Sequence, residues 1–195
     1  YDGKGQIVID TNKIDLEALK IIEENDCIIE EFQDFQSEVS IIASRGESGS
    51  VLTYDSGSNV HKDGILIKTT VPSDLDKKIE IELALAAGKI LNKLDYIGVM
   101  GIEFFVTSKG LVLNEFAPRV HNSGHWTLDG CLISQFEQHI RAISGWSLGS
   151  TKRHSNIIMT NIIGKEIKYD INDNQSLYCY GKKDVRLGRK MGHIN

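Results

Sequence analysis

The sequence predicts an α+β protein, and three stretches carry this prediction. Residues 99–107 and 111–116 are rich in Val, Ile, Leu and Phe and flank a short turn, like the two strands of an antiparallel hairpin. Apolar residues recur at helical spacing over 75–94 and again over 128–143. Strands that adjoin in sequence, with helices long enough to cover them, are typical of this architecture.

The composition excludes several classes of protein. Of 195 residues, 41% are apolar and 25% charged, which is ordinary for a globular protein with one substantial core or two small ones. No apolar run approaches the ~18 residues of a membrane span, and a net charge of −5 argues against general nucleic-acid binding. The three cysteines lie far apart, so we expect buried, reduced thiols in a cytoplasmic protein and no zinc site.

The first third of the chain predicts one helix and several short strands. Residues 15–24 suit an amphipathic helix with Asp15 as its N-cap. Alternating or β-branched stretches predict strands at 7–10, 27–32, 38–44 and 51–54.

The remaining elements carry recognisable end signals. Ser73-Asp74-Leu75-Asp76 has the form of a capping box and opens the helix of residues 75–94. The helix over 128–143 ends at Gly145. Strands are predicted at 156–163 and 177–180, with a turn at 172–175 between them.

The hairpin of residues 99–116 brings two glutamates together. A three-residue loop, Ser108-Lys109-Gly110, pairs Thr107 with Leu111 and therefore Glu103 with Glu115. Their Cβ atoms would lie only ~5 Å apart, which is unfavourable for like charges. Such a pair either raises one pKa or holds a cation, and Mg²⁺ suits oxygen ligands of this kind. The alternatives are two solvated glutamates on an exposed face, or a register that differs by one residue.

Three further segments are candidates for chemistry. Five polar side chains, at 119, 121, 122, 123 and 125, follow Pro118 next to the glutamate pair, more than a surface loop requires. Asp2-Gly3-Lys4-Gly5 suits a phosphate-binding loop, although it also makes a good hairpin turn. Between Gly181 and His193, five Lys/Arg accompany one Asp, so this strongly basic segment is also a candidate. The alternative to a functional role is ordinary surface basicity. A lone loop histidine such as His61 is more often solvated than a ligand.

Three motifs resemble the ATP-grasp ligases, and among them the 5-(carboxyamino)imidazole ribonucleotide synthases of purine biosynthesis. They are YDGKGQ at 1–6, NEFAPRVHNSGHWTLDGCLISQFEQHIRAI at 114–143 and YGKKDVRLGRKMGH at 180–193. The resemblance implies an ATP-grasp fold, mostly antiparallel sheets with packed helices, that lacks the family's N-terminal α/β domain. It divides the chain into the remainder of the lid subdomain (1–33), the ATP-grasp C subdomain (34–150) and a small C-terminal domain (151–195).

The resemblance also implies an ATP and Mg²⁺ site. Glu103 and Glu115 match the metal ligands, in agreement with the hairpin argument. Asn114 would assist there, although strict alternation points it to the opposite face unless the strand bulges. The residues that match ATP contacts are Tyr1, Asp2, Gly3, Lys4, Gly5, Gln6, Glu30, Glu31, Phe32, Gln33, Glu38, His61, Asn114 and Glu115.

The matching substrate positions follow in the later motifs. Arg119, His121 and Asn122 match residues near bicarbonate and the imidazole substrate and, with Lys4, are the expected catalytic residues. Lys182 and Arg189 match the grip on the 5′-phosphate of the ribotide, with Arg186 and Lys190 as weaker candidates.

The implied activity is ATP-dependent carboxylation of 5-aminoimidazole ribonucleotide by bicarbonate through carboxyphosphate, in a cytoplasmic homodimer. The 195-residue piece, expected to be a fragment, is expected to be inactive alone. Two alternatives stay open. One is another ATP-grasp ligase, such as the formate-dependent glycinamide ribonucleotide transformylase or a biotin carboxylase. The other is a non-catalytic nucleotide-binding module.

Overall fold

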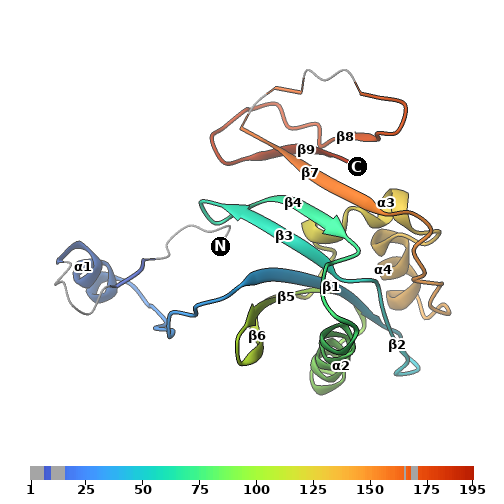
Figure 1. Cartoon of the computed structure of the whole chain (residues 1–195), viewed down its shortest axis with the longest axis horizontal. Coiled ribbons are helices and arrows are strands. Elements are labelled where there is room, and N and C mark those ends of the chain that lie inside the picture. The colour runs from blue at the N-terminus through green and yellow to red at the C-terminus, as the bar shows by residue number, and fades with distance from the viewer. Residues whose placement is uncertain (1–6, 10–15, 165, 168–170) are drawn as a thin grey trace.

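A computed structural model gives the fold, and it describes residues 7–9, 16–164, 166–167 and 171–195. One sheet dominates the described part, with helices packed against it, while the short helix α1 (Leu16–Glu24) lies apart (Figure 1). The strands are β1 (Ser37–Arg45), β2 (Val51–Thr53), β3 (Gly57–Lys62), β4 (Ile65–Val71), β5 (Gly98–Thr107), β6 (Gly110–Ala117), β7 (Ile157–Ile163), β8 (Leu177–Cys179) and β9 (Lys190–Ile194). The other helices are α2 (Lys77–Lys93), α3 (Thr127–Gly130), α4 (Gln135–Ile143) and the 3₁₀ turn η1 (Asn122–Gly124). The α+β prediction is confirmed.

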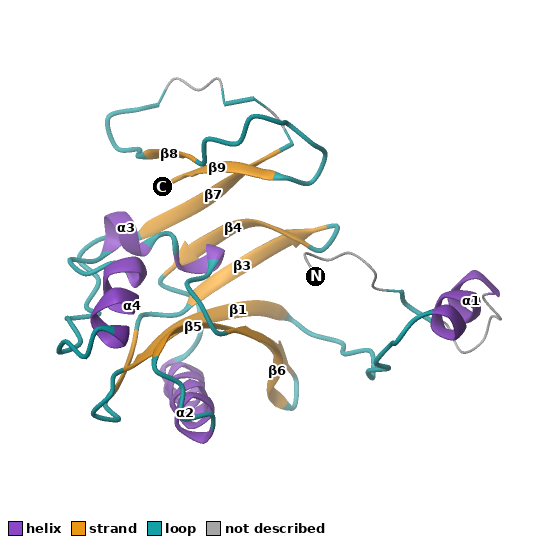
Figure 2. Cartoon of the chain, turned by 180° about the vertical axis from the view of Figure 1, so that it is seen from behind, coloured by secondary structure: helices purple, strands orange, loops and turns teal. Residues whose placement is uncertain are grey.

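All pairings in the described sheet are antiparallel, in the order β6-β5-β1-β3-β4-β7-β9-β8, with β2 added beside β1. The sheet runs without a break from the β5–β6 hairpin to the C-terminal strands, since β4 pairs with β7 (Figure 2). The segment predicted as a separate C-terminal domain therefore extends the same sheet. The division of the chain into three domains stays a prediction.

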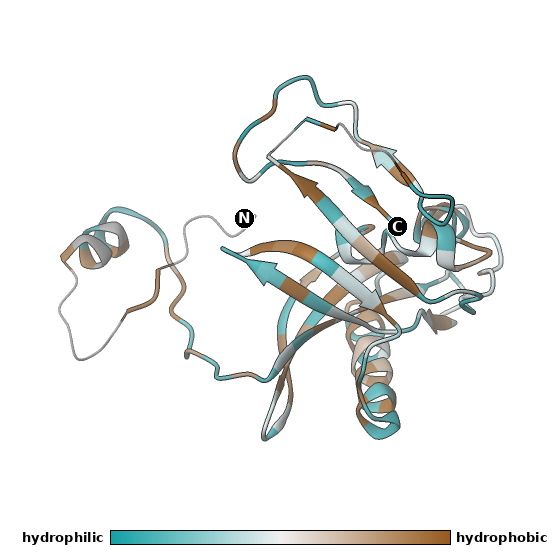
Figure 3. Ribbon diagram, turned by 45° about the horizontal axis from the view of Figure 1, so that its top comes forward, coloured by the Kyte–Doolittle hydropathy of each residue, from teal (hydrophilic) through white to brown (hydrophobic). Residues whose placement is uncertain are grey.

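The two faces of the sheet have different cores. On one face α2 buries Leu83, Ala87 and Leu91 against alternate residues of β1 and β5. On the other face Trp126 and Tyr54 pack with Ile42 and Met159 under α3 and α4. Hydrophobic and hydrophilic patches alternate along the strands (Figure 3), because successive side chains point to opposite faces. Glu38 and Glu103 stand on the face away from α2, where the polar loop also lies.

Most of the predicted elements exist, and several predictions were wrong. The structure confirms, within a few residues, the helices predicted over 15–24 and 75–94, the turn over 172–175 and the strands over 38–44, 51–54, 99–107, 111–116, 156–163 and 177–180. Residues 27–32 and 7–9 form no strand. Three strands were missed: β3, β4 and β9. Asp10 and the proposed Asp15 cap lie outside the described residues.

Capping and thiol burial also differ from prediction. Asp76, not Ser73, caps α2, because its carboxylate accepts from the backbone N–H groups of Lys78 and Ile79. Ser73 instead bonds to the Ser56 hydroxyl at 2.7 Å. Of the three free cysteines only Cys131 is buried, whereas Cys27 and Cys179 are exposed.

The single helix predicted over 128–143 is two helices. Cys131 is extended and forms a bridge with Arg153, which ends α3, and the Ser134 hydroxyl then caps α4 by accepting from Glu137 N. Helix α4 buries polar side chains and leaves apolar ones partly exposed, the reverse of an ordinary amphipathic helix. Gln135, Gln138 and Ala142 are buried, while Phe136, Ile140 and Ile143 are partly exposed.

No helix in the described ranges is long and apolar enough to cross a membrane.

Candidate active site

Glu103 and Glu115 lie directly opposite each other in the β5–β6 pair, as the sequence predicts. The route to this pairing differs from the prediction. Thr107 pairs with Gly110 across a two-residue turn, and the register then shifts by one between Glu103 and Phe104. Asn114 is the extra residue of this bulge, because Leu113 pairs with Phe104 and Glu115 with Glu103. The bulge frees Asn114 from strict alternation.

The two carboxylates differ in environment. Glu103 is 7% exposed, whereas Glu115 is exposed on the outer strand. Burial, together with the negative charges of Glu115 and Glu38, raises the pKa of Glu103 to about 7, although His61 and Lys190 oppose the rise. The folded chain thus holds a carboxylate whose charge is poorly compensated by its surroundings.

A divalent cation fits this pair. Carboxylate oxygens with a neighbouring amide are ligands that Mg²⁺ accepts, and Mg²⁺ commonly takes only one or two carboxylates, its other ligands being water and phosphate oxygens. Among the described residues no group of three or more His, Cys, Asp or Glu could hold a metal by itself.

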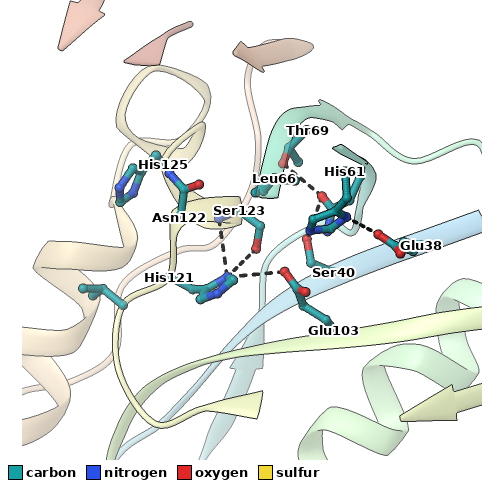
Figure 4. A network of polar contacts seen from close by, with 12 residues as sticks. Glu38, Ser40, His61, Leu66, Thr69, Glu103, His121, Asn122, Ser123 and His125 are labelled. Carbon is teal, nitrogen blue, oxygen red and sulfur yellow. Dashed lines mark hydrogen bonds and ion pairs between the residues drawn. The ribbon is translucent and has the colours of Figure 1, made fainter. Parts of the chain in front are cut away.

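Glu38 and His61 contact each other on the same face, from the neighbouring strands β1 and β3 (Figure 4). His61 lies in a strand, not in the loop that the sequence predicts, and follows a register shift after Val60. Burial alone would lower the pKa of His61, but the hydrogen bond and charge of Glu38 raise it above the usual value. Glu38, paired with His61 beside the glutamate pair, is well placed to accept hydrogen bonds from hydroxyl groups.

A buried hydrogen-bond network joins these strands. Asn59 Oδ1 accepts from Thr69 Oγ1 at 2.9 Å and from Ser40 Oγ at 3.3 Å. Ser40 pairs with Glu103 across β1 and β5, so the network adjoins the glutamate. Sequence reasoning missed these three residues because small polar side chains inside strands carry no distinctive pattern.

His121 lies across from Glu103, with 3.7 Å between its Nδ1 and Glu103 Oε1 (Figure 4). Its Nδ1 also lies 2.9 Å from the Ser123 hydroxyl, and the backbone turns into η1 immediately after it. Burial, followed by the nearby charges of Arg119, Lys190 and His61, lowers the pKa of His121 to about 4. His121 is therefore a neutral imidazole at pH 7.

Gly101 makes this position of His121 possible. A Cβ atom on Gly101 would lie 2.3 Å from His121 Cβ, closer than real Cβ atoms come to other atoms. Gly101 is two residues before Glu103 on β5 and shares its face. The glycine thus lets the polar loop reach the sheet surface beside the carboxylates.

The other two residues predicted in this loop are placed differently. Asn122 forms a mutual amide pair with Asn161 of β7, with N···O distances of 2.9 and 2.6 Å. Arg119 is exposed, and its guanidinium donates to the carbonyl of Val120 at 3.0 Å. Asn122 ties the loop to the C-terminal strands, whereas the guanidinium of Arg119 faces solvent.

The basic segment of residues 181–193 folds back on itself. Lys182 Nζ donates to the backbone carbonyl of Lys190 at 2.6 Å and lies 5.3 Å from the centre of the Tyr180 ring. Arg189 donates to the carbonyl of Asp184 at 3.0 Å, and Arg186 forms an exposed ion pair with Asp184 at 3.4 Å. Lys190, a weaker candidate in the sequence analysis, begins β9. Its charge opposes the rise in the pKa of Glu103 and adds to the lowering of the pKa of His121 by burial and Arg119.

Two other segments were predicted to contact ATP. Tyr1 to Gln6, including Lys4, lie outside the described residues. Residues 30–33 form an irregular, mostly exposed segment, in which Gln33 donates to the Glu31 carbonyl at 3.4 Å. This segment leads to Phe35, whose ring stacks on Phe105 with centroids 4.4 Å apart. Phe105 pairs with Glu38 in the sheet, so an aromatic surface adjoins that carboxylate.

One face of this antiparallel sheet therefore carries paired carboxylates and a loop with a neutral histidine, close to a basic segment. Residues 1–136 match the family model of the ATP-grasp domain, and the chain belongs to that family. Residues 157–195 match the model of the phosphoribosylaminoimidazole carboxylase C-terminal domain.

The chain is similar to several N5-carboxyaminoimidazole ribonucleotide synthases. The chain is 49% identical over 202 residues to the N5-carboxyaminoimidazole ribonucleotide synthase of Brucella melitensis, covering 100% of this chain and 56% of that protein. It is similar to the crystal structure of the Thermus thermophilus synthetase, with TM-score 0.86 and 42% identity over 92% of this chain and 51% of that one. It also resembles the Aspergillus clavatus synthase in complex with ADP and 5-aminoimidazole ribonucleotide (TM-score 0.75, 32% identity, 82% and 46% covered).

The chain spans about half the length of the curated relatives that it matches.

Proposed function

We propose that the protein containing this chain carboxylates 5-aminoimidazole ribonucleotide with bicarbonate and ATP. The observation that carries the proposal is the group formed by Glu103, Glu115 and His121 on one face of the sheet. A relative whose structure holds ADP and 5-aminoimidazole ribonucleotide supports the choice of substrates.

The two glutamates would hold Mg²⁺, with Asn114 beside them. When bound, the metal would neutralise phosphate charge, which is the main requirement of phosphoryl transfer. The burial of Glu103 supports this assignment, since a cation offsets the cost of its charge. Glu38 would hold the ribose hydroxyls of ATP, His61 would make a further contact with the nucleotide, and the segment of residues 30–33 would pass its base.

The proposed reaction has two steps. A bicarbonate oxygen attacks the γ-phosphorus of ATP, the bond from that phosphorus to the ADP oxygen breaks, and carboxyphosphate forms. The exocyclic amine then attacks the carboxyl carbon, phosphate leaves, and the amine nitrogen loses a proton. Arg119 offers a planar pair of donors to bicarbonate. Neutral His121 accepts the amine proton or hydrogen-bonds to the reacting carboxyl group.

The basic segment would hold the ribotide. Lys182 and Arg189, helped by Arg186 and Lys190, would contact its 5′-phosphate, and Lys4 with the glycine loop of residues 1–6 would close over ATP. Since water destroys carboxyphosphate, closure protects the intermediate. We further propose the homodimer, the cytoplasmic location and the three-domain division predicted from the sequence.

A substrate panel tests the proposal. The full-length protein is incubated with Mg-ATP and either labelled bicarbonate and aminoimidazole ribonucleotide or labelled formate and glycinamide ribonucleotide. Label should enter an acid-labile carbamate only with the imidazole substrate. If label is incorporated only with another acceptor, the chain is part of a different ATP-grasp ligase.

A further inference from the structure

The buried face of α4 carries amide side chains where a helix usually presents aliphatic ones. Gln135 and Gln138 are both 0% exposed. A buried amide without partners costs free energy, so each must find hydrogen bonds inside the protein. Each does so by bonding to both polar groups of one backbone residue in a loop, which makes the two residues a matched pair.

Gln135 holds His121. Its Oε1 accepts from the backbone N–H of His121 at 3.0 Å, and its Nε2 donates to the His121 carbonyl at 2.7 Å. The same Nε2 lies 3.1 Å from His125 Nδ1. The amide therefore satisfies the main chain of His121 much as a neighbouring strand would, at the residue whose ring faces Glu103.

The loop is shaped to admit this amide. A Cβ atom on Gly124 would lie 2.6 Å from Gln135 Oε1, so the glycine leaves room for it. The Thr127 hydroxyl donates to the Gly124 carbonyl at 2.7 Å and accepts from Gln135 N at 3.0 Å. Both ends of the segment from His121 to Thr127 are thus tied to the first residue of α4.

Gln138 makes the same pattern of bonds elsewhere. Its Nε2 donates to the Gly149 carbonyl at 2.9 Å, and its Oε1 accepts from Gly149 N at 2.8 Å. Gly149 belongs to the loop that leads to β7, and a Cβ atom built on it would meet Ile133, which is not a candidate site residue. Gln138 therefore reproduces the burial and hydrogen bonding of Gln135 without its link to the site.

We propose that Gln135 is a positioning residue that fixes the backbone of His121, and so its imidazole, against Glu103. This inference rests on the proposed function for its catalytic consequence, but the contact itself does not depend on that function. An error of about 1 Å in the placement of a reacting group can cost on the order of 100-fold in rate. Among the described residues, Gln135 is the one side chain that hydrogen-bonds to the main chain of His121.

Amide hydrogen exchange on the full-length protein tests the contact without reference to activity. In the wild type the His121 and Gly149 amides should both exchange slowly. Gln135→Met should speed exchange at His121 by at least about tenfold, because a lost hydrogen bond exposes the donor. Gln138→Met should speed exchange at Gly149 instead. Unprotected exchange at His121 in the wild type would overturn the proposal without any variant.

Turnover separates positioning from stability. At matched loss of melting temperature, Gln135→Met should lower kcat by roughly 10- to 100-fold with KM for ATP little changed, whereas Gln138→Met should stay within about twofold of wild type. Gln135→Glu provides a second variant of nearly the same shape. It keeps the acceptor for His121 N–H but places an oxygen against the His121 carbonyl, and should lower kcat as well.

The outcomes distinguish the two proposals. If both methionine variants lose activity equally, Gln135 supports only the fold and the positioning role is wrong. If the wild type shows the protection pattern but carboxylates no ribonucleotide, the proposed function fails while the contact between Gln135 and His121 stands.

Discussion

Glu103 and Glu115 face each other across β5 and β6 at the one register shift of that hairpin. The shift matters for the pair. With a two-residue turn and no bulge, Glu103 would face Asn114, and Glu115 would be displaced by one position. The bulge instead aligns the carboxylates and sets Asn114 beside them. Bulges often re-aim side chains next to active sites.

The first prediction concerns the cost of burying Glu103. Its pKa in the folded protein is about 7, above the value of an unfolded chain, so the unfolded state loses its proton first as pH rises. Stability should therefore fall between about pH 4.5 and 7. Without Mg²⁺, Glu103→Gln should stabilise the protein by roughly 1–3 kcal/mol at pH 8 and little at pH 4.5. Denaturant unfolding at both pH values measures this, and equal effects would contradict it.

The second prediction concerns the outer carboxylate. In the full-length protein Glu115→Gln should lower Mg²⁺-dependent ADP formation by about 100-fold or more, since the metal would lose one of two anionic ligands. A coupled ADP assay at several Mg²⁺ concentrations measures the effect. Glu82→Gln, on the exposed side of α2, is the control and should leave the rate unchanged. Wild-type turnover in Glu115→Gln would remove the metal assignment.

The third prediction concerns the contact between Gly101 and His121. Gly101→Ala should displace His121, because the new methyl group would overlap its Cβ. We expect kcat to fall by on the order of 10- to 100-fold with ATP affinity retained. Gly46→Ala is a matched control, since a Cβ there meets Leu148 Cγ only at 3.6 Å. Normal turnover in Gly101→Ala would show that His121 needs no such position.

The fourth prediction concerns histidines that are buried in neutral form. Burial lowers the pKa of His193 to about 4, and its Nδ1 lies 2.8 Å from the Tyr180 hydroxyl. Burial similarly lowers the pKa of His125 to about 3. Because the unfolded chain binds these protons first, each histidine should cost up to about 1.4 kcal/mol of stability per pH unit as pH falls from 6.5 towards its folded pKa.

Melting temperatures between pH 7.5 and 4.5 check this prediction. His193→Gln, which cannot take up a proton there, should be less stable at pH 7.5 but should show a shallower decline. An equally steep decline in the variant would mean that His193 does not contribute to the acid sensitivity.

The sequence predicts the hairpin and its glutamate pair because both strands are strongly apolar and a glycine marks the turn. It predicts the pair through the wrong turn, however. A three-residue loop without a bulge gives the same pairing at Glu103 as a two-residue turn with a bulge at Asn114. A bulge depends on cross-strand geometry and leaves no local mark, so periodicity does not distinguish the two routes.

Two other differences have tertiary causes. Strand β3 reads as a turn because Gly57 and Ser58 punctuate it, yet Gly57 is there for close packing: a Cβ would lie 2.5 Å from Thr69 Cγ2. In α4 the spacing of the apolar residues predicts a helix correctly. The buried side, however, is the one that carries Gln135 and Gln138, because these side chains bond to the backbone of two loops, at His121 and Gly149. Such partners are set by the fold.

The most direct measurement is ADP release by the full-length protein with Mg-ATP and bicarbonate, with and without 5-aminoimidazole ribonucleotide. The proposed function predicts that the ribonucleotide strongly stimulates ADP release. Release that is indifferent to the ribonucleotide, or no release at all, would contradict it.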